Sequence, residues 1–437
     1  MPPPRCTHTS VGLASSRAAF SSPLAEQLAG GVLERFLRYV RIDTQSSEDS
    51  DTVPSTAKQL DLSRLLVAEL QAIGLHDAAL TEHGYVLATL PGAPAAPVIG
   101  LIAHVDTTPE TPGAGVVPIV HPAYDGTTIV LPGDLTQMLD PAVEPALAAR
   151  IGQDIVTSDG TTLLGADDKA GVAEIMAALE YLATHPEPAH ATVRVAFTVD
   201  EEVGRGAEHL DLDEFGAEVG YTLDGSGLGE LEIETFSARA VRVAIRGRGV
   251  HPGTAKGKLV NSVKLAAHLV AALPRDALSP ETTEGREGFV HPVRISGTVE
   301  EAVVSFIARD HDETMLEQHT ELLRRLAREI GDREPRARVT VEVTDTYRNM
   351  GTAIDRHPRV VSAAEEAIRR AGVEPVRSII RGGTDGAVLS AKGLPTPNLF
   401  TGGQEYHSLR EWASVQDMAA AAATVVELVR VWAEPTV

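Results

Sequence analysis

The chain has 437 residues, too many for one ordinary hydrophobic core, so we expect one large and one small domain. Its formal charge of -23 repels phosphate backbones and argues against a nucleic acid partner, and no apolar run is long enough to span a bilayer. The only cysteine, Cys6, excludes an internal disulfide framework and a thiolate metal cage, so metal ligands would have to be His, Asp or Glu.

Residues 1–22 are rich in Pro, Ser and Thr and show no amphipathic period, which predicts a disordered tail. A transit peptide is the alternative, because this stretch contains Arg and Ser but no acidic residue. We expect a cytoplasmic protein.

Helical periodicity and strand-like runs alternate over the first half of the chain. Helices are predicted around 33–40 and 65–73, and strands at 84–90, 98–106, 192–199 and 219–223. Residues 107–150 are rich in Pro and Gly, are predicted to contain one helical turn at 145–150, and are expected to shape a site. The alternation predicts a mixed, mostly parallel sheet flanked by helices, with ligands bound beyond the carboxyl ends of its strands.

Acidic residues and histidines gather at those strand ends. Asp167 and Asp168 lie in a Gly-flanked turn before a strongly periodic helix, a position in which acid pairs usually serve metals. The other residues at or near strand ends are His104, Asp106, Glu201, Glu202, Asp224 and His407.

From about residue 236 the pattern changes to alternation of period two. The predicted order β-α-β-β-α-β is that of a ferredoxin-like α+β unit, which can fold as an inserted domain. We therefore divide the chain into a large domain of residues 23–235 and 350–437 and an inserted domain of residues 236–349. In the last part we expect a helix at 360–371, a glycine loop at 381–386, a strand at 398–401 and a helix from 414.

His and carboxylate side chains are ligands that Zn²⁺ accepts, and one carboxylate can bridge two ions. Asp106 is suited to fix the orientation of His104 from behind. Glu201 and Glu202, as neighbours on a strand, would diverge, so that one could bind metal while the other serves as general base. At any single site the plainer alternative is a hydrogen-bonded pair at a strand end.

A nucleotide-binding protein is a rival interpretation, since residues 251–259, HPGTAKGKL, look superficially like a phosphate loop. The segment fails that motif, which needs four residues between its glycines and Ser or Thr after the lysine.

Seven segments together resemble the peptidase T family of dinuclear zinc aminopeptidases. They are HVDT, LLGADDKAG, FTVDEEVGRGAEHLD, VHPGTAKGKLVNS, YRNMG, RGGTDGA and PNLFTGGQEYH, in this order. The resemblance covers nearly the whole chain beyond the first ~22 residues. It differs at Gln404, Glu405 and residues 408–410, which bears on fine specificity.

The resemblance implies two Zn²⁺ per subunit and a role for each matched residue. His104 and Asp224 would bind one ion, Glu202 and His407 the other, and Asp167 both; the Asp167–Asp168 peptide would be cis. Glu201 would be the catalytic base, with Asp106 beside it. His251, on the inserted domain, would reach the scissile carbonyl, often across a dimer, unless it only caps a turn in its loop. Arg309, Arg381 and Asn349 would bind the substrate.

The implied activity is removal of the N-terminal residue from tripeptides, with small peptides as substrates and a homodimer as one arrangement. The inserted domain would then act as a lid or in dimerisation. A dipeptidase or an acyl-amino-acid deacylase of the same family is the alternative. A non-catalytic peptide-binding protein is a second alternative. The absence of a metal-ligating residue or of the catalytic base would favour it, and all of these residues are present in the sequence.

Overall fold

The first helix begins where the sequence supplies a cap. Ser22 accepts a hydrogen bond from the Ala25 N–H, and Pro23 follows at the first helical position, so α1 spans Pro23–Tyr39. The computed structural model describes residues 18–435. Of the predicted tail, residues 1–17 lie outside the described residues, whereas Ala18 donates a backbone hydrogen bond to Gly152.

Eight strands form the central sheet. Their order is β1 (Ala79–Leu80), β2 (Val86–Leu90), β8 (Thr192–Thr198), β3 (Val98–His104), β9 (Val219–Gly225), β16 (Asn398–Phe400), β10 (Glu230–Thr235) and β15 (Val376–Ile380). β3 is parallel to β8 and to β9, β9 is parallel to β16, and β10 is parallel to β15. β2 runs antiparallel to β8, and β10 runs antiparallel to β16. The predicted mixed, mostly parallel sheet is confirmed; β10 and β15 were not predicted.

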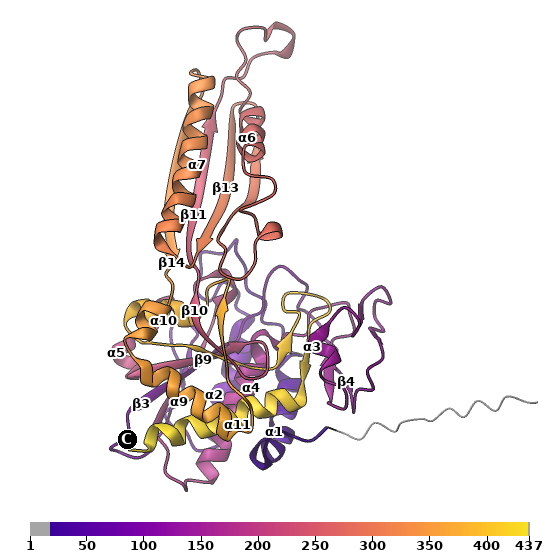
Figure 1. Ribbon diagram of the computed structural model, residues 1–437, viewed down its shortest axis with the longest axis vertical. Helices are drawn as coiled ribbons and strands as arrows, with labels where there is room; N and C mark the ends of the chain where they lie inside the picture. The colour runs from indigo at the N-terminus through magenta and orange to yellow at the C-terminus, as the bar shows by residue number, and fades with distance from the viewer. Residues whose placement is uncertain (1–17, 436–437) are drawn as a thin grey trace, which may run out of the picture.

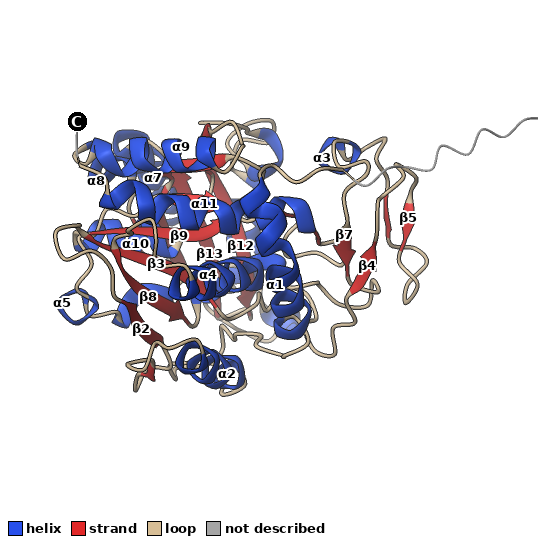
Figure 2. Ribbon diagram, turned by 90° about the horizontal axis from the view of Figure 1, so that it is seen from below, coloured by secondary structure: helices blue, strands red, loops and turns tan. Residues whose placement is uncertain are grey.

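Helices cover the sheet in a layer that Figure 2 shows from below. α4 (Ala166–Thr184) contacts β3 and β9 and is itself packed against α1 and α11 (Val415–Ala433), which explains why most residues of α4 are buried. α9 (Pro358–Arg370) lies against α11. The remaining helices of the body are α2 (Gln59–Ala72), α3 (Pro145–Ala148), α5 (Leu212–Phe215), α8 (Gly351–Asp355) and α10 (Asp385–Lys392). None of the described helices has the length and apolar content needed to cross a membrane.

The Pro- and Gly-rich excursion folds into a small lobe. It contains the hairpin β5 (Ile129–Val130) and β6 (Met138–Leu139), and a sheet in the order β17 (Gly403–Gln404), β18 (Trp412–Ser414), β7 (Ile155–Thr157), β4 (Ile119–His121). Sequence analysis predicted only α3 here. The small sheet places the segment around His407 beside the chain that leads into α4, because β18 pairs with β7.

The inserted unit stands away from the body as an elongated layer of strands and helices (Figure 1). Its chain order is β11 (Ser237–Arg246), α6 (Ser262–Ala271), β12 (Phe289–Gly297), β13 (Glu301–Asp310), α7 (Glu313–Arg333) and β14 (Arg338–Tyr347). The strands form one antiparallel sheet in the order β12-β13-β11-β14. A separate cluster of buried apolar side chains, including Val243, Phe306 and Leu323, fills it. The predicted ferredoxin-like insert is confirmed.

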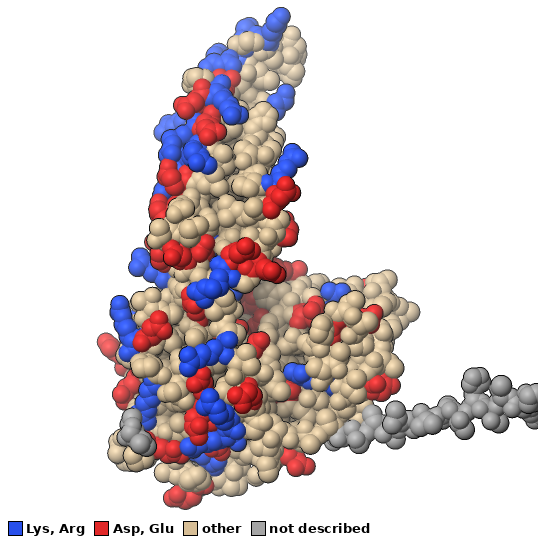
Figure 3. Space-filling model, in the orientation of Figure 1, with Lys and Arg blue, Asp and Glu red and all other residues tan. Residues whose placement is uncertain are grey.

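Arginine contacts tie the insert to the body. Glu234, at the end of β10, accepts hydrogen bonds from Arg286 of the insert at 2.7 Å and from Asn349 at 3.0 Å. Arg381 of the body donates to three acceptors in the insert loop 283–287, at 2.8 to 2.9 Å. On the face in Figure 3, acidic side chains gather where the insert meets the body.

Candidate metal centre

His104 ends strand β3 at the carboxyl edge of the central sheet, where it is buried. Its Nε2 atom lies 3.0 Å from one carboxylate oxygen (Oδ1) of Asp167 and 3.6 Å from Oδ1 of Asp224. Its Nδ1 atom is 3.4 Å from Oδ1 of Asp106, the acid predicted to orient the ring. A second acid follows Asp167: the Oδ2 atom of Asp168 accepts a hydrogen bond from the His104 backbone at 3.1 Å.

His407 faces the same acid from the opposite side. Its Nε2 atom lies 3.2 Å from Oδ2 of Asp167 and 2.9 Å from Oε2 of Glu202. Asp167 therefore presents one oxygen to each histidine, the arrangement expected of a carboxylate that bridges two ions. Within the described residues, two groups have ligand atoms close enough to hold a metal: His104 with Asp168 and Asp224, and Asp167 with Glu202 and His407.

The turn that carries Asp167 is not regular helix. Gly165 has a φ of 84°, which favours glycine, and Asp167 and Asp168 are joined by a cis peptide bond, as the resemblance implied. The buried carboxylate of Glu411 accepts hydrogen bonds from the backbone N–H groups of Leu164, Gly165 and Asp167 at 2.8, 2.6 and 3.0 Å. Burial raises the pKa of Glu411 to about 7, against the lowering effect of these donors. Glu411 was not predicted, because no motif or periodic pattern in the sequence marks it.

Glu201 and Glu202 do not continue a strand, so the predicted strand geometry is wrong. They form a 3-10 turn, η1 (Glu201–Val203), because Asp200, two residues past the end of β8, takes a left-handed conformation with φ of 63°. The carboxylate of Asp106 accepts the backbone N–H groups of Glu201 at 3.1 Å and Glu202 at 3.2 Å. Asp106 thus contacts both the His104 ring and the turn that carries the two glutamates.

Asp200 anchors this turn to the start of α2. Its buried carboxylate accepts hydrogen bonds from the backbone N–H of Ser55 at 2.7 Å, from the Ser55 hydroxyl and from the Gln59 amide at 2.7 Å. The cis Val53–Pro54 bond precedes Ser55. Asp200 was not among the predicted site residues, and its contacts with the start of α2 join segments more than 140 positions apart.

Crowding of buried carboxylates perturbs the titration of the site. Burial raises the pKa of Asp224 to about 7 and that of Glu202 to about 8, with the Asp167 charge adding to both. Burial alone would lower the pKa of His407, but its bonds to Asp167 and Glu202 raise it to about 11. One oxygen each of Asp168 and Glu202 is buried without a hydrogen-bond partner. Dense negative charge, unpartnered oxygens and histidine nitrogens together fit divalent cations.

The predicted substrate-binding residues lie at the junction of body and insert. Arg309 is between the rings of Phe289 and Tyr347, 5.8 and 5.9 Å from their centroids, and donates to the Arg381 carbonyl at 3.4 Å. The Asn349 amide bonds to Glu234 and to the His311 carbonyl, and its oxygen accepts from Gly351. The Tyr347 hydroxyl is buried without a partner. Burial raises the pKa of this phenol to about 12, with the Glu201 charge contributing.

His251 is not brought to the metal centre within this chain. The ten-residue strand β11 begins beside the body at Ser237 and runs to the far end of the insert (Figure 1). His251 follows that far end, roughly 30 Å along the strand from the junction. There it is exposed, and its Nδ1 accepts from the Gly253 N–H at 3.2 Å.

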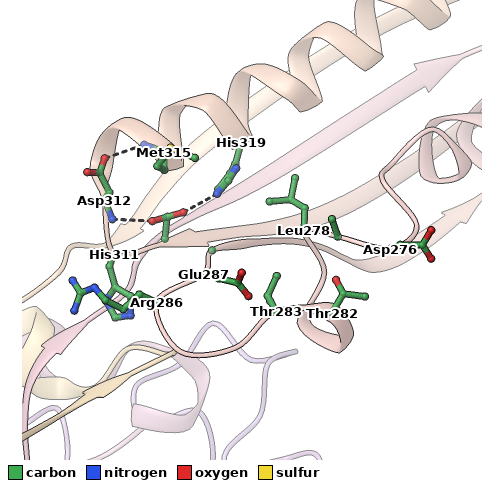
Figure 4. A pocket seen from close by; sticks show the side chains of 13 residues that line it. Asp276, Leu278, Thr282, Thr283, Arg286, Glu287, His311, Asp312, Met315 and His319 are labelled. Carbon is green, nitrogen blue, oxygen red and sulfur yellow. Dashed lines mark hydrogen bonds and ion pairs between the residues drawn. The ribbon is translucent and has the colours of Figure 1, made fainter.

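A cavity of about 730 Å³ lies at the base of the insert and contains none of the metal-ligand residues. Figure 4 shows His319 on one side of it and Thr283 and Glu287 on another. His319 bonds to Asp310, and Arg381 donates to the Thr283 hydroxyl and the Glu287 carbonyl. We therefore treat the histidine and carboxylate cluster, and not this cavity, as the reactive centre.

Comparison with known proteins agrees with the geometry. The sequence model of Peptidase family M20/M25/M40 matches residues 159–431. Peptidase T of Bacillus subtilis (strain 168) is 47% identical over 91% of this chain and 98% of its own length. Peptidase T of Clostridium botulinum (strain 657 / Type Ba4) is 48% identical over 92% of this chain and 99% of its own.

Solved structures share the fold. Aminopeptidase PepT of Bacillus cereus ATCC 10987 superposes with a TM-score of 0.70 at 25% identity, covering 93% of this chain and 99% of that one. A tripeptidase of Staphylococcus aureus has a TM-score of 0.71 at 23% identity, covering 92% and 98%. With the family match and the close relatives, these findings show that the chain belongs to Peptidase family M20/M25/M40, in its peptidase T branch.

Proposed function

We propose that this peptidase removes the N-terminal residue from tripeptides at a centre that holds two Zn²⁺ ions. The observation that carries the proposal is the placement of Asp167, whose two oxygens face His104 and His407 from 3.0 and 3.2 Å. His104 and Asp224 would hold one ion and Glu202 and His407 the other, with Asp167 shared. The high identity to peptidase T over nearly the whole chain supports tripeptides as the substrate class.

The residues of the chain supply positioning and proton transfer. Bound zinc ions supply Lewis acidity, which polarises a carbonyl and makes water easier to deprotonate. Glu201 accepts the proton of the attacking water and passes it to the leaving amine. Burial raises the pKa of Glu201 well above its usual range, with His104 opposing and Asp224 adding to the shift. Asp106 holds the imidazole of His104 in one tautomer and orientation.

Substrate assays test the activity. The purified, zinc-loaded protein is offered tripeptides, dipeptides and N-acetylated amino acids of matched side chains, and we expect turnover of tripeptides with release of the first residue. Turnover of dipeptides alone would assign a dipeptidase, and turnover of the acetylated set alone a deacylase. Metal analysis that finds less than about one zinc per loaded chain would favour a non-catalytic protein, since a closed two-ion site retains its metal.

The inserted unit serves in this proposal as a lid and a dimerisation domain. His251 lies past the far end of β11, so a second copy of the chain is the better source of the histidine that completes each site. His251 would stabilise the oxyanion formed on the scissile carbonyl, while Arg309 and Arg381, with Asn349, would bind the carboxylate end of the substrate.

Mixing inactive variants tests the shared site. His251→Ala and Glu201→Gln should each lower turnover with zinc content unchanged, because neither removes a metal ligand. In a mixed dimer one site would combine an intact Glu201 with an intact His251, so activity should return on mixing. Absence of recovery in dimers shown to exchange subunits would contradict a shared site, and near-normal turnover by His251→Ala alone would reduce His251 to a turn cap.

We place this activity in the cytoplasm. The single cysteine, Cys6, leaves the fold without internal disulfides, as is usual for proteins of a reducing compartment. Fractionation of the native cells, with the peptidase followed by antibody, tests the location.

A further inference from the structure

Two ligands of the candidate metal centre come from segments far apart in the chain, and one buried side chain connects them. Glu411 is four residues after His407, in the loop between β17 and β18, and is 1% exposed. Its Oε2 atom accepts the N–H groups of Leu164 and Gly165 at 2.8 and 2.6 Å, and its Oε1 atom accepts the N–H of Asp167 at 3.0 Å. The segment that supplies His407 therefore also holds the backbone of Asp167.

Besides its bonds to Glu411, the turn at Asp167 is held by the Asp168 carboxylate, which accepts the His104 N–H at 3.1 Å, and by the Lys169 N–H, which donates to the Gly165 carbonyl at 3.3 Å. Leu164, Gly165 and Asp167 lie before or in the first turn of α4, where backbone N–H groups have no partner within the helix, and Asp167 and Asp168 have non-helical backbone angles. The Gly165 N-cap has no side chain to cap them. A carboxylate that accepts three backbone donors replaces the missing cap and suits the positive end of the helix dipole.

We infer that Glu411 is a positioning residue that sets where Asp167 presents its two oxygens between His104 and His407, and so tunes the affinity of the centre for its metal ions. This inference rests on the proposed two-metal function. Partners that orient a metal ligand typically change metal affinity by about 10- to 100-fold when they are replaced.

Glu411→Gln is the sharpest test, because it keeps size and shape but replaces one acceptor oxygen with a donor. If the amide oxygen of the glutamine faces Leu164 and Gly165, its N–H groups face the backbone N–H of Asp167. If the amide is rotated by half a turn, its N–H groups face the backbone N–H groups of Leu164 and Gly165. Either way a buried donor loses its partner. Glu174→Gln is the matched control. Glu174, on α4, is a fully buried carboxyl like Glu411, but neither of its oxygens has a hydrogen-bond partner among the described residues.

Metal affinity is measured on full-length protein by competition between zinc and a chromophoric chelator, with circular dichroism of the metal-free form as a check on folding. We expect Glu411→Gln to bind the weaker ion at least about tenfold less tightly than the parent, and Glu174→Gln to bind both ions like the parent. With Co²⁺ in both positions, the magnetic coupling that a bridging carboxylate produces should weaken in Glu411→Gln and persist in Glu174→Gln.

Parent-like affinity and coupling in a folded Glu411→Gln protein would overturn the inference. Should that variant not fold, Glu411→Asp keeps the charge but shortens the side chain, and parent-like affinity in Glu411→Asp would overturn it equally. A parent protein that binds no pair of zinc ions would contradict the proposed function instead, so the two failures are distinguishable.

Discussion

Glu201 and Glu202 are neighbours in one 3-10 turn, yet they have different surroundings. The carboxylate of Glu202 lies 2.9 Å from His407. Among the described residues the Glu201 carboxylate makes no hydrogen bond or ion pair with a metal-centre residue, and it is influenced by the charges of His104 and Asp224. This difference supports a metal ligand in Glu202 and a proton acceptor in Glu201.

Replacing each with its amide should separate the two roles. Glu201→Gln removes the proton acceptor and should lower turnover by roughly 10² to 10⁴ with zinc content unchanged, whereas Glu202→Gln should lose zinc. Steady-state kinetics and metal analysis of the same samples measure both effects. Loss of zinc in Glu201→Gln with retention in Glu202→Gln would exchange the two assignments.

At the scale of elements, the turn η1 depends on a contact with the start of α2. Ser55→Ala removes the hydroxyl bond to the buried Asp200 carboxylate and should lower the free energy of unfolding by about 1–3 kcal/mol. Chemical denaturation measures the change. Ser50→Ala, which removes a surface hydroxyl bonded to Thr52, is the control and should cost less than about 0.5 kcal/mol. Equal stability of both variants would show that Asp200 keeps its place without Ser55.

At the scale of the whole molecule, the metal-free protein should lose stability as pH rises from about 5 to about 8. Asp224 and Glu202, with pKa values raised to about 7 and 8, keep protons that the unfolded chain has released. The pKa of His407 is raised to about 11. Its contribution to the free energy of unfolding is therefore fully present below the ordinary histidine pKa and decreases as the pH rises above that value. All three therefore act in the same direction.

Thermal and chemical denaturation of dialysed protein across this pH range should show a loss of at least about 3 kcal/mol. Added zinc should remove the loss at pH 8 and help less at pH 5, because metal binding displaces the bound protons. A metal-free protein whose stability increases over this range would contradict the proposed electrostatics of the centre.

Features that depend on a local sequence pattern could be predicted, whereas residues whose role depends on contacts between distant segments could not. The metal-ligand candidates were recognisable because acids and histidines end strongly apolar strands, and the insert because its alternation is regular. Asp200 and Glu411 were not, since each bonds to segments more than 140 positions away and lies in no periodic pattern. Strands β7, β10 and β15 are short or carry polar residues on partly exposed positions, so their pairing depends on neighbours.

The two ends of the inserted unit meet at the body, where the Asn349 backbone N–H donates to the Ser237 hydroxyl at 2.9 Å. The more than one hundred residues between them therefore form a loop whose two ends are in contact. The entropy cost of closing such a loop during folding of the body increases only slowly with the length of the loop. A lineage could lengthen, shorten or exchange the insert without disturbing the order in which the strands of the body assemble. Substitutions in the inserted unit can then accumulate independently of the body residues that form the metal centre.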